Sequence, residues 1–176
     1  MKIIELSKKE YKGYKLEYKY QTKYFYDVKI KEKHDVKITL KKKKTLFKQE
    51  KTFKDELFAD YIDVSDVFGI FEKKKLIAVV EGSLETWHNR YRIWNVLVEQ
   101  KYRRKGYGKM LFDHIEMVAK KKGARALILE TQSCNYPAIQ FYKKMGYHFK
   151  GLDLASYSND DIKKKEVRLE YGKEIK

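Results

Sequence analysis

Apolar and polar side chains alternate with a period of two in two neighbouring stretches near the N-terminus. Residues 24–30 show the first alternation and residues 36–40 the second, with the polar break Glu32-Lys33-His34 between them. Because successive side chains of a strand point to opposite faces, this pattern predicts a β-hairpin. Residues 1–6 are expected to form a further short strand.

The segment after this hairpin combines a run of lysines with spaced apolar residues. Residues 41–44 are all lysine, which predicts a solvated turn. Between residues 47 and 61 the apolar positions have the spacing of a helix rather than a strand; they are Phe53, Leu57, Phe58 and Tyr61. This spacing predicts a helix in residues 47–61.

Three apolar runs of strand length follow, separated by short polar turns. They lie at residues 67–71, 76–85 and 91–98, and no segment rich in Pro, Gly or Ser interrupts them. Runs of this length joined by short turns predict an antiparallel meander.

Beyond residue 98 the apolar period becomes that of a helix. The residues spaced for one buried face are Met110, Leu111, Ile115, Val118 and Ala119, and Gly123 suits the end of that helix. The continuous apolar run at residues 126–129 predicts a strand buried on both faces. A strand–helix–strand order requires a crossover, so this strand should run parallel to the one ending at Val98.

A second helix and a closing strand pair complete the pattern. Pro137 suits the first turn of the helix and Gly146 its end, and the residues expected on its buried face are Ala138, Phe141, Tyr142 and Met145. Residues 147–154 and 165–171 predict two closing strands. The fold class is therefore α/β (α+β), with a mixed sheet.

Composition excludes several classes of protein. A chain of 176 residues with 43% hydrophobic and 15% aromatic residues suffices for the core of one domain. No apolar run has the length of a membrane span, and the first residues lack a signal-peptide core, so we expect a cytoplasmic protein and no membrane partner. The single cysteine, Cys134, excludes an internal disulfide framework.

The net charge of +16 has two explanations. Lysines dominate it and are spread over the whole chain, which is typical of a solubilising surface that also attracts a polyanionic cofactor. A basic nucleic-acid-binding module without catalysis is the alternative from another class. We do not expect nucleic acid as a partner.

The stretch Val98–Lys109 carries the most specific chemistry. An apolar strand runs into a basic turn with Gly106 and Gly108, and a helix follows. Unpaired N–H groups at a helix N-terminus bind anions, and glycine lets the backbone approach them closely. The cations around this turn are Arg103, Arg104, Lys105 and Lys109. Leu111 rules out a G-x-G-x-x-G fingerprint and no G-K-[S/T] follows, so the turn predicts a pyrophosphate site of another type.

The spacing Arg103-x-x-Gly106-x-Gly108 resembles the R/Q-x-x-G-x-G/A signature of the Gcn5-related N-acetyltransferase (GNAT) superfamily. The later block Asn135-x-x-Ala138-x-x-Phe141-Tyr142-x-x-x-Gly146-Tyr147 resembles the next conserved block of that superfamily. Two blocks in the right order, one strand apart, are far more specific than either block alone.

This resemblance implies a mixed, mostly antiparallel sheet with helices on both faces, whose central parallel strands splay apart near Val98 and Glu130. It also implies acetyl-CoA as the cosubstrate, without metal, with the pyrophosphate on the loop and the pantetheine arm bonded to backbone groups at the strand end. Asn135 fits either a helix N-cap or a cofactor contact. The expected cofactor-binding residues are Leu97, Val98, Arg103, Arg104, Lys105, Gly106, Tyr107, Gly108, Lys109, Asn135 and Tyr142.

Acetyl transfer to an amine requires a group that accepts the proton of the ammonium and an acid for the departing thiolate. Tyr142 is the predicted acid because of its position in the second block. Glu130, which ends the parallel strand, is the predicted base, with Glu81 and Glu85 as alternatives. Cys134 lies near the same strand end, but no histidine is obviously placed to activate it, so we expect direct transfer.

Within the superfamily, the chain resembles the streptothricin acetyltransferases from about residue 65 onward. The matching pieces are Asn89-Arg90-Tyr91, Leu129-Glu130-Thr131-Gln132 with Asn135, and Phe141-Tyr142. Those enzymes carry acidic residues on the strand before the anion loop, where this chain has Trp94 and Asn95. Acidic groups there would hold a cationic acceptor, so their replacement puts streptothricin itself in doubt.

The expected organisation is a single N-acetyltransferase domain over residues 1–176, with a variable part in 1–62 and the GNAT core in 63–172. The expected reaction moves an acetyl group to a primary amine of a small molecule, with a streptothricin-like antibiotic as one example. A protein or peptide amine is the alternative acceptor. The sequence leaves the oligomeric state open, with a homodimer as one alternative.

Overall fold

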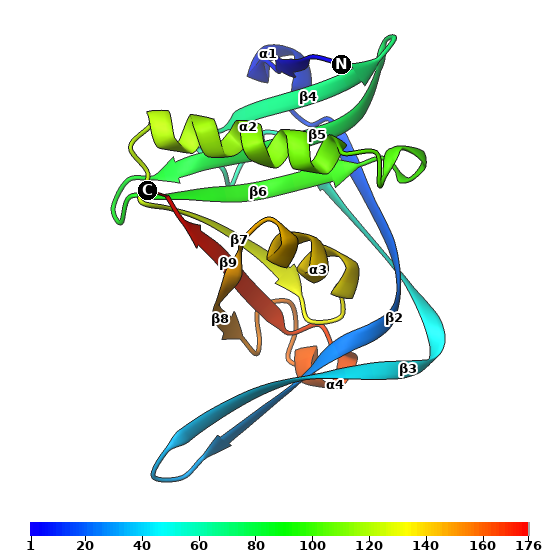
Figure 1. Ribbon diagram of the computed structural model, residues 1–176, viewed down its shortest axis with the longest axis vertical. Coiled ribbons are helices and arrows are strands. Elements are labelled where there is room, and N and C mark those ends of the chain that lie inside the picture. The colour runs from blue at the N-terminus through cyan, green and yellow to red at the C-terminus, as the bar shows by residue number, and fades with distance from the viewer. Residues whose placement is uncertain (176) are drawn as a thin grey trace. The chain divides into compact units, whose positions relative to one another are not determined.

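The computed structural model describes residues 1–175 (Figure 1). Its strands are β1 (Ile3–Glu5), β2 (Lys15–Glu32), β3 (Val36–Glu56), β4 (Asp66–Glu72), β5 (Lys75–Glu85), β6 (Arg90–Val98), β7 (Ala126–Gln132), β8 (His148–Asp153) and β9 (Arg168–Glu174). Its helices are α1 (Lys8–Tyr11), the 3₁₀ turn η1 (Gln100–Tyr102), α2 (Tyr107–Lys121), α3 (Tyr136–Lys144) and α4 (Asp161–Lys164). None of the helices in this described part is long and apolar enough to cross a membrane.

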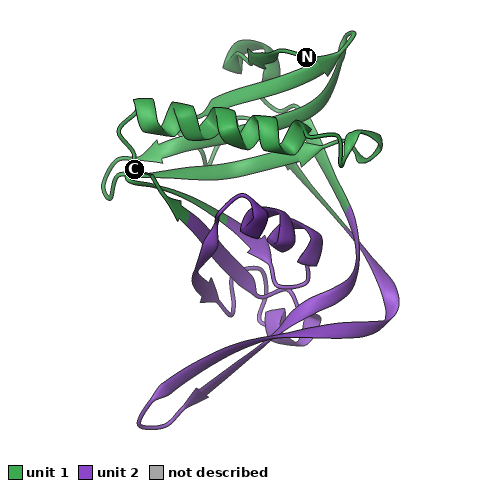
Figure 2. Ribbon diagram, in the orientation of Figure 1, with its two compact units in different colours: residues 1–19, 52–129, 173–176 green, residues 20–51, 130–172 purple. Residues whose placement is uncertain are grey.

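The chain forms two compact units, which Figure 2 shows in different colours. Unit 1 contains residues 1–19 and 52–129 and the C-terminal residues from Lys173, and unit 2 contains residues 20–51 and 130–172. The chain therefore passes from one unit to the other four times, and the units do not follow the expected division at residue 62. The single N-acetyltransferase domain stays a prediction.

Unit 1 is built on the predicted meander. Strands β1, β4, β5 and β6 pair antiparallel in that order, and β7 runs parallel to β6. The prediction of a mixed, mostly antiparallel sheet is confirmed. The paired register of β6 and β7 covers Arg90–Ile93 and Ala126–Leu129, whereas β6 itself continues to Val98.

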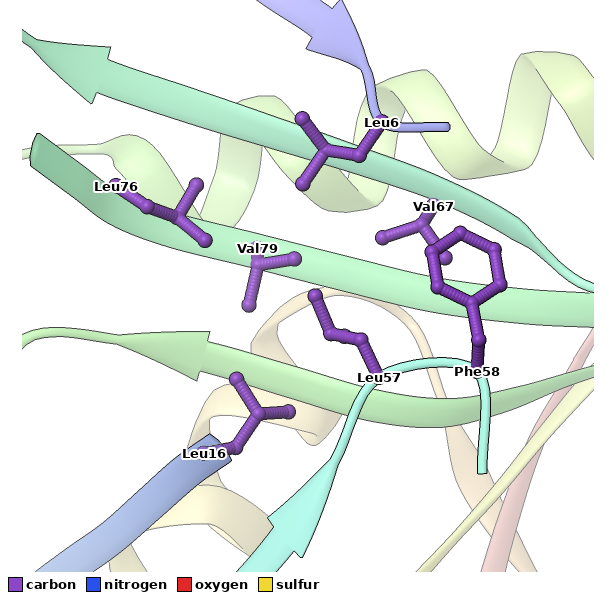
Figure 3. Close-up of a cluster of buried hydrophobic side chains, with 7 residues drawn as sticks. All are labelled: Leu6, Leu16, Leu57, Phe58, Val67, Leu76 and Val79. Atoms are coloured by element: carbon purple, nitrogen blue, oxygen red, sulfur yellow. The ribbon is translucent and has the colours of Figure 1, made fainter. Parts of the chain in front are cut away.

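Two different layers cover the sheet of unit 1. Helix α2 packs across β4, β5 and β6 (Figure 1), where Phe68 of β4 meets His114 with ring centroids 4.4 Å apart. The face opposite α2 carries the core shown in Figure 3: Leu6, Leu16, Leu57, Phe58, Val67, Leu76 and Val79. Neighbouring residues of β4 thus serve opposite layers, as the alternation of a strand requires.

The buried face of α2 agrees with the helical period except at two positions. The residues it buries are Leu111, Phe112, Ile115 and Ala119, whereas Met110 and Val118 are only half-buried. Gly123 follows the helix with a φ of +73°, so the predicted C-terminal stop is confirmed.

A β-bulge interrupts the pairing of β5 with β6. Glu81 pairs with Asn95 and Gly82 with Ile93, so Trp94 is the extra residue of β6. A Cβ atom at Gly82 would lie 2.8 Å from the carbonyl oxygen of Arg92 and 2.4 Å from the Tyr91 ring. Only glycine allows this close approach. At the bulge the Trp94 side chain bonds to Ser83 and the Asn95 side chain bonds to Glu81.

Unit 2 contains α3, α4 and the antiparallel pair of β8 with β9 as far as Gly172. Helix α3 is capped by Asn135, whose side chain accepts a hydrogen bond from the Ala138 N–H, and Pro137 lies in its first turn. Gly146, with a φ of +86°, follows its end. Of the predicted buried face only Tyr142 is fully buried, together with Ile139, which helical spacing alone does not single out.

The N-terminal hairpin is confirmed but is much longer than predicted. Strands β2 and β3 form a two-stranded sheet of their own, and the helix expected in residues 47–61 is wrong because β3 extends to Glu56. Cross-strand packing decides this, since Phe53 stacks on Tyr18 with ring centroids 4.4 Å apart. Leu57 and Phe58 then turn into the core of unit 1.

The solvated turn predicted for residues 41–44 is also wrong, since these lysines lie within β3. Lys42 lies over the ring of Tyr24, 4.3 Å from its centroid, and Lys43 pairs with Asp27 at 2.6 Å. All four lysines are exposed, so a lysine run fits in this strand as well as in a turn.

Candidate functional site

The anion-binding loop, residues 99–109, connects β6 to α2 and is anchored at two points. Tyr102 is buried and donates a hydrogen bond to Glu72 of β4. Arg103 Nε donates to the carbonyl oxygen of Val98 at 2.9 Å, which fastens the loop to the end of β6. These contacts hold the loop in place before any ligand binds.

Gly106 is the N-cap of α2 and has a φ of +89°, a left-handed conformation that glycine adopts without strain. Met110 donates to the Gly106 carbonyl at 3.0 Å, so helix geometry leaves the N–H groups of Tyr107, Gly108 and Lys109 without an intrahelical acceptor. No side chain caps this end of α2, and its first turn holds no acidic residue. These amides and the helix dipole favour a bound anion.

Cationic side chains surround these amides. Arg103, Arg104 and Lys105 are exposed. Lys109 pairs with Asp113 at 2.5 Å, but both side chains are at least half exposed, so solvent screens this pair. A Cβ atom at Gly106 would meet nothing within 4 Å, so the approach to the amides is open. The loop therefore fits a diphosphate.

A cavity of about 350 Å³ lies beside this loop within unit 1. Leu97, Arg103 and Ala78 line it together with the first residues of β2. Because Glu17 and Glu99 also line it, its charge is mixed and does not by itself attract a diphosphate. The loop amides, rather than this cavity, are the candidate diphosphate site.

Glu81 is fully buried and both of its carboxylate oxygens are occupied. Oε1 accepts hydrogen bonds from the Phe58 N–H at 2.9 Å and the Ser65 hydroxyl at 2.7 Å, and Oε2 accepts from Asn95 at 3.0 Å. Tyr18 donates to the Asn95 carbonyl oxygen at 2.6 Å. Glu81 thus joins the bulge in β6 to the core segment at Phe58.

The other two predicted carboxylates are partnered as well. Glu85 accepts from Arg92 Nε at 2.7 Å and lies 3.3 Å from His88 Nε2, and its side chain is 18% exposed. Glu130 lies 2.9 Å from a guanidinium nitrogen of Arg168 and accepts from the Tyr157 hydroxyl at 3.3 Å. The Glu130 side chain is 35% exposed, so it is the most accessible of the three carboxylates.

Tyr142 and Cys134 both lie in unit 2 and are both buried. Burial raises the pKa of Tyr142, so its hydroxyl keeps its proton at neutral pH. Burial also raises the pKa of the Cys134 thiol, which lies 3.2 Å from the Tyr20 hydroxyl. A thiol held protonated in this way is a poor nucleophile.

The model of the Acetyltransferase (GNAT) family matches residues 34–147, which is more than half of the chain. The chain belongs to the GNAT acetyltransferase family. Streptothricin acetyltransferase of Streptomyces lavendulae is 40% identical to it over 75 residues. That match covers 43% of this chain and 40% of the relative, so it spans less than half of the relative's length.

Two solved acetyltransferase structures resemble this chain over almost its whole length. The crystal structure of nourseothricin acetyltransferase has a TM-score of 0.79 at 24% identity, covering 98% of this chain and 97% of its own. A Bacillus anthracis protein in complex with acetyl coenzyme A has a TM-score of 0.71 at 20% identity, covering 99% and 97%. The fold that this chain shares with these two structures therefore includes the N-terminal hairpin, which the two sequence blocks leave out.

The predicted GNAT site residues fall into two sets. Leu97, Val98 and residues 103–109 lie together in unit 1, whereas Glu130, Asn135 and Tyr142 belong to unit 2. Asn135 caps α3 in this structure, and a cofactor contact by it stays a prediction. Within residues 1–175, no group of three or more His, Cys, Asp or Glu side chains is arranged to hold a metal ion.

Sequence reasoning missed one group of residues in unit 1, which lines a second cavity. Tyr61, Asp63 and Trp87 lie in turns and are exposed. Large aromatic side chains in otherwise polar turns are a signal that sequence alone offers, but only the fold shows that these turns meet.

Proposed function

We propose that this chain is an acetyl-CoA-dependent N-acetyltransferase that moves an acetyl group from the thioester directly to a primary amine of a small molecule. The observation that carries the proposal is the uncapped N-terminus of α2 behind Gly106, surrounded by exposed cations. Membership of the GNAT family supports it, as does the solved relative with acetyl coenzyme A.

The residues of the anion-binding loop would hold the diphosphate of the coenzyme. The N–H groups of Tyr107, Gly108 and Lys109 supply donors, and Arg103, Arg104 and Lys105 supply positive charge. The backbone of Leu97 and Val98, at the end of β6, would bond the pantetheine arm. The thioester supplies an activated acetyl group, which lets the chain itself act mainly by positioning.

In the proposed reaction the amine nitrogen bonds to the acetyl carbon and the carbon–sulfur bond breaks. The amine loses one proton, and the departing thiolate gains one. We assign Tyr142 as the donor of that second proton because it stands in the Phe141-Tyr142 block that resembles the second block of the superfamily, and because its buried hydroxyl is protonated at neutral pH. Solvent then returns a proton to Tyr142.

We retain Glu130 as the group that accepts the amine proton. Glu81 is enclosed by three donors and is fully buried, and Glu85 accepts hydrogen bonds from Arg92 and Arg90. Glu130 also has partners, Arg168 and Tyr157, but it is the most exposed of the three carboxylates, so an amine or a bridging water can reach it.

For the acceptor we propose a streptothricin-like antibiotic, supported by the names of the Streptomyces relative and of the nourseothricin enzyme. A peptide or protein amine is the competing acceptor. Thiol release from acetyl-CoA is to be measured with streptothricin, aminoglycosides, polyamines and peptides. We expect streptothricin to raise thiol release above the background hydrolysis of acetyl-CoA. If only peptides raise it, the acceptor is a peptide or protein amine instead of an antibiotic.

Coenzyme A binding separates this proposal from a basic nucleic-acid-binding module. Coenzyme A at 100 times its dissociation constant should stabilise the fold by about 2.7 kcal/mol. The nucleic-acid module predicts no such stabilisation and salt-sensitive binding of nucleic acid instead. The absence of any thermal shift with coenzyme A would overturn the enzyme proposal.

Tyr142→Phe tests the proposed acid. We expect turnover to fall by about 100-fold while the affinity for acetyl-CoA stays within about twofold, because the ring and its packing are kept. Tyr171→Phe is the matched control, since Tyr171 is another buried tyrosine of unit 2 to which we assign no chemistry. An unchanged turnover number in Tyr142→Phe would remove this residue from the mechanism.

A further inference from the structure

A second cavity of about 490 Å³ lies within unit 1. Four segments line it: residues 61–64 before β4, residues 83–87 at the end of β5 and its turn, Trp94 of β6, and Lys122 after α2. Neither the anion-binding loop nor any residue assigned above to the coenzyme lines this cavity. It is large enough for a small organic molecule.

Three aromatic side chains, Tyr61, Trp87 and Trp94, contribute to the wall of this cavity. Trp87 is 84% exposed and Tyr61 is 63% exposed, which is unusual for such large side chains. Trp94 is fixed, because its indole N–H donates to the Ser83 hydroxyl at 2.8 Å and its ring lies 6.1 Å from that of Tyr61. Exposed aromatic rings around a hollow mark a binding surface for cations or for ring-shaped ligands.

The charges of the cavity favour a cationic ligand. Lys122 pairs with Asp66 at 2.7 Å, and Glu85 is engaged by Arg92. Asp63 is exposed and has no ion-pair partner within residues 1–175, so its negative charge is available to a ligand. The cavity therefore combines one uncommitted carboxylate with three aromatic rings.

We propose that this aromatic cavity binds the amine acceptor, and that the acceptor is a cationic amine with a ring-shaped body. A cationic group of the acceptor lies against Asp63 and over the ring of Trp87 or Tyr61, and its ring-shaped body packs on Trp94. This inference rests on the proposed function, whose acceptor class it specifies.

The bulge in β6 explains why the cavity can serve in this way. Trp94 is the extra residue of that bulge, and bulges re-aim side chains beside functional sites. The streptothricin acetyltransferases that the chain resembles carry acidic residues on this strand, where this chain has Trp94 and Asn95. The side chain of Asn95 donates a hydrogen bond to Glu81. Asp63 supplies, from a neighbouring segment, the negative charge that β6 lacks.

Fluorescence reports on this cavity directly, because the two tryptophans of the chain, Trp87 and Trp94, both line it. Tryptophan emission is to be titrated with streptothricin, with spermine as a cation without a ring, and with glucose as a neutral ring. We expect saturable quenching in the order streptothricin, spermine, glucose. No quenching by streptothricin, or equal quenching by glucose, would overturn the proposal.

Two substitutions test the assigned contacts. Asp63→Asn and Trp87→Ala should each raise KM for the acceptor about tenfold, with KM for acetyl-CoA unchanged. The matched controls are Asp160→Asn and Phe47→Ala, exposed residues of unit 2 whose loss should leave both KM values unchanged. Acceptor binding by calorimetry replaces fluorescence for Trp87→Ala, since that variant loses one fluorophore.

The outcomes separate this inference from the proposed function. If streptothricin is acetylated and KM for it is the same in Asp63→Asn, Trp87→Ala and wild type, the reaction stands and the aromatic cavity is not the acceptor site. If streptothricin quenches tryptophan emission and Asp63→Asn weakens that quenching, but no acetyl group is transferred, the cavity stands as a binding site for a cationic, ring-shaped amine and the proposed acetylation of streptothricin fails.

Discussion

The anion-binding loop and the aromatic cavity lie in the same unit but are made of different parts of the chain. The loop presents main-chain N–H groups from three consecutive residues, and its side chains mainly add charge. The cavity presents side chains from four segments, and the backbone only carries them. The main-chain site should tolerate changes of side chain but not changes of backbone conformation. The cavity should instead depend on the contacts that hold its aromatic rings in place.

Glu81→Gln should have the largest effect on stability. Of the two sites, it should affect only the aromatic cavity. The amide nitrogen of glutamine would face the Phe58 N–H and the Ser65 hydroxyl, or else the Asn95 amide, so two donors would meet in a buried place. We expect a loss of about 2–4 kcal/mol in the free energy of unfolding, measured by urea denaturation. Acceptor affinity should fall as well, because Asn95 adjoins Trp94 in the bulge.

Glu99→Gln is the control for this charge change. Glu99 pairs with Lys75 at 3.1 Å, and both side chains are more than one third exposed, so its loss should change the free energy of unfolding by less than about 0.5 kcal/mol. Equal destabilisation by the two substitutions would show that Glu81 does not hold the bulge through its hydrogen bonds.

Gly82→Ala tests the bulge itself and should have a smaller effect. A Cβ at this position would lie 2.8 Å from a backbone carbonyl oxygen, which the flanking strand cannot easily move. We expect a loss of about 1–3 kcal/mol in stability and a raised KM for the acceptor, with coenzyme affinity unchanged. Gly151→Ala in β8 is the control, because its nearest neighbour would be 3.9 Å away and ordinary contact results.

The contrast between the two sites also explains what could be predicted from the sequence. The loop is contiguous, so a single stretch of chain with Arg103, Gly106 and Gly108 predicts it. The meander, the crossover helix and the parallel strand follow from local periodicity for the same reason. Asp63 and Trp87 are brought to one cavity only by the fold, and no local pattern links them.

In the hairpin, local periodicity predicted the wrong secondary structure. Phe53, Leu57, Phe58 and Tyr61 have helical spacing, yet they belong to three environments: a strand, the core and an exposed turn. The stacking of Phe53 on Tyr18 is a long-range contact that no window of sequence contains. The residues do have helical spacing, but cross-strand pairing determines the structure of this segment.

Gly106→Ala tests the main-chain site and should have the smallest effect on stability. Alanine in the left-handed conformation at φ +89° costs about 1 kcal/mol, and relief of that strain would rotate the first amides of α2. We expect KM for acetyl-CoA to rise about fivefold while KM for the acceptor is unchanged. Kinetics with each substrate varied in turn would measure both values.

Gly123→Ala at the other end of α2 is the matched control for this prediction. Gly123 also has a positive φ, +73°, and a Cβ there also meets nothing within 4 Å, so the cost in stability should be the same. Because this end of the helix presents carbonyl groups rather than amides, KM for acetyl-CoA should not change. If the two variants raise that KM equally, helix stability rather than the amides behind Gly106 governs coenzyme binding, and the contrast between the two sites fails.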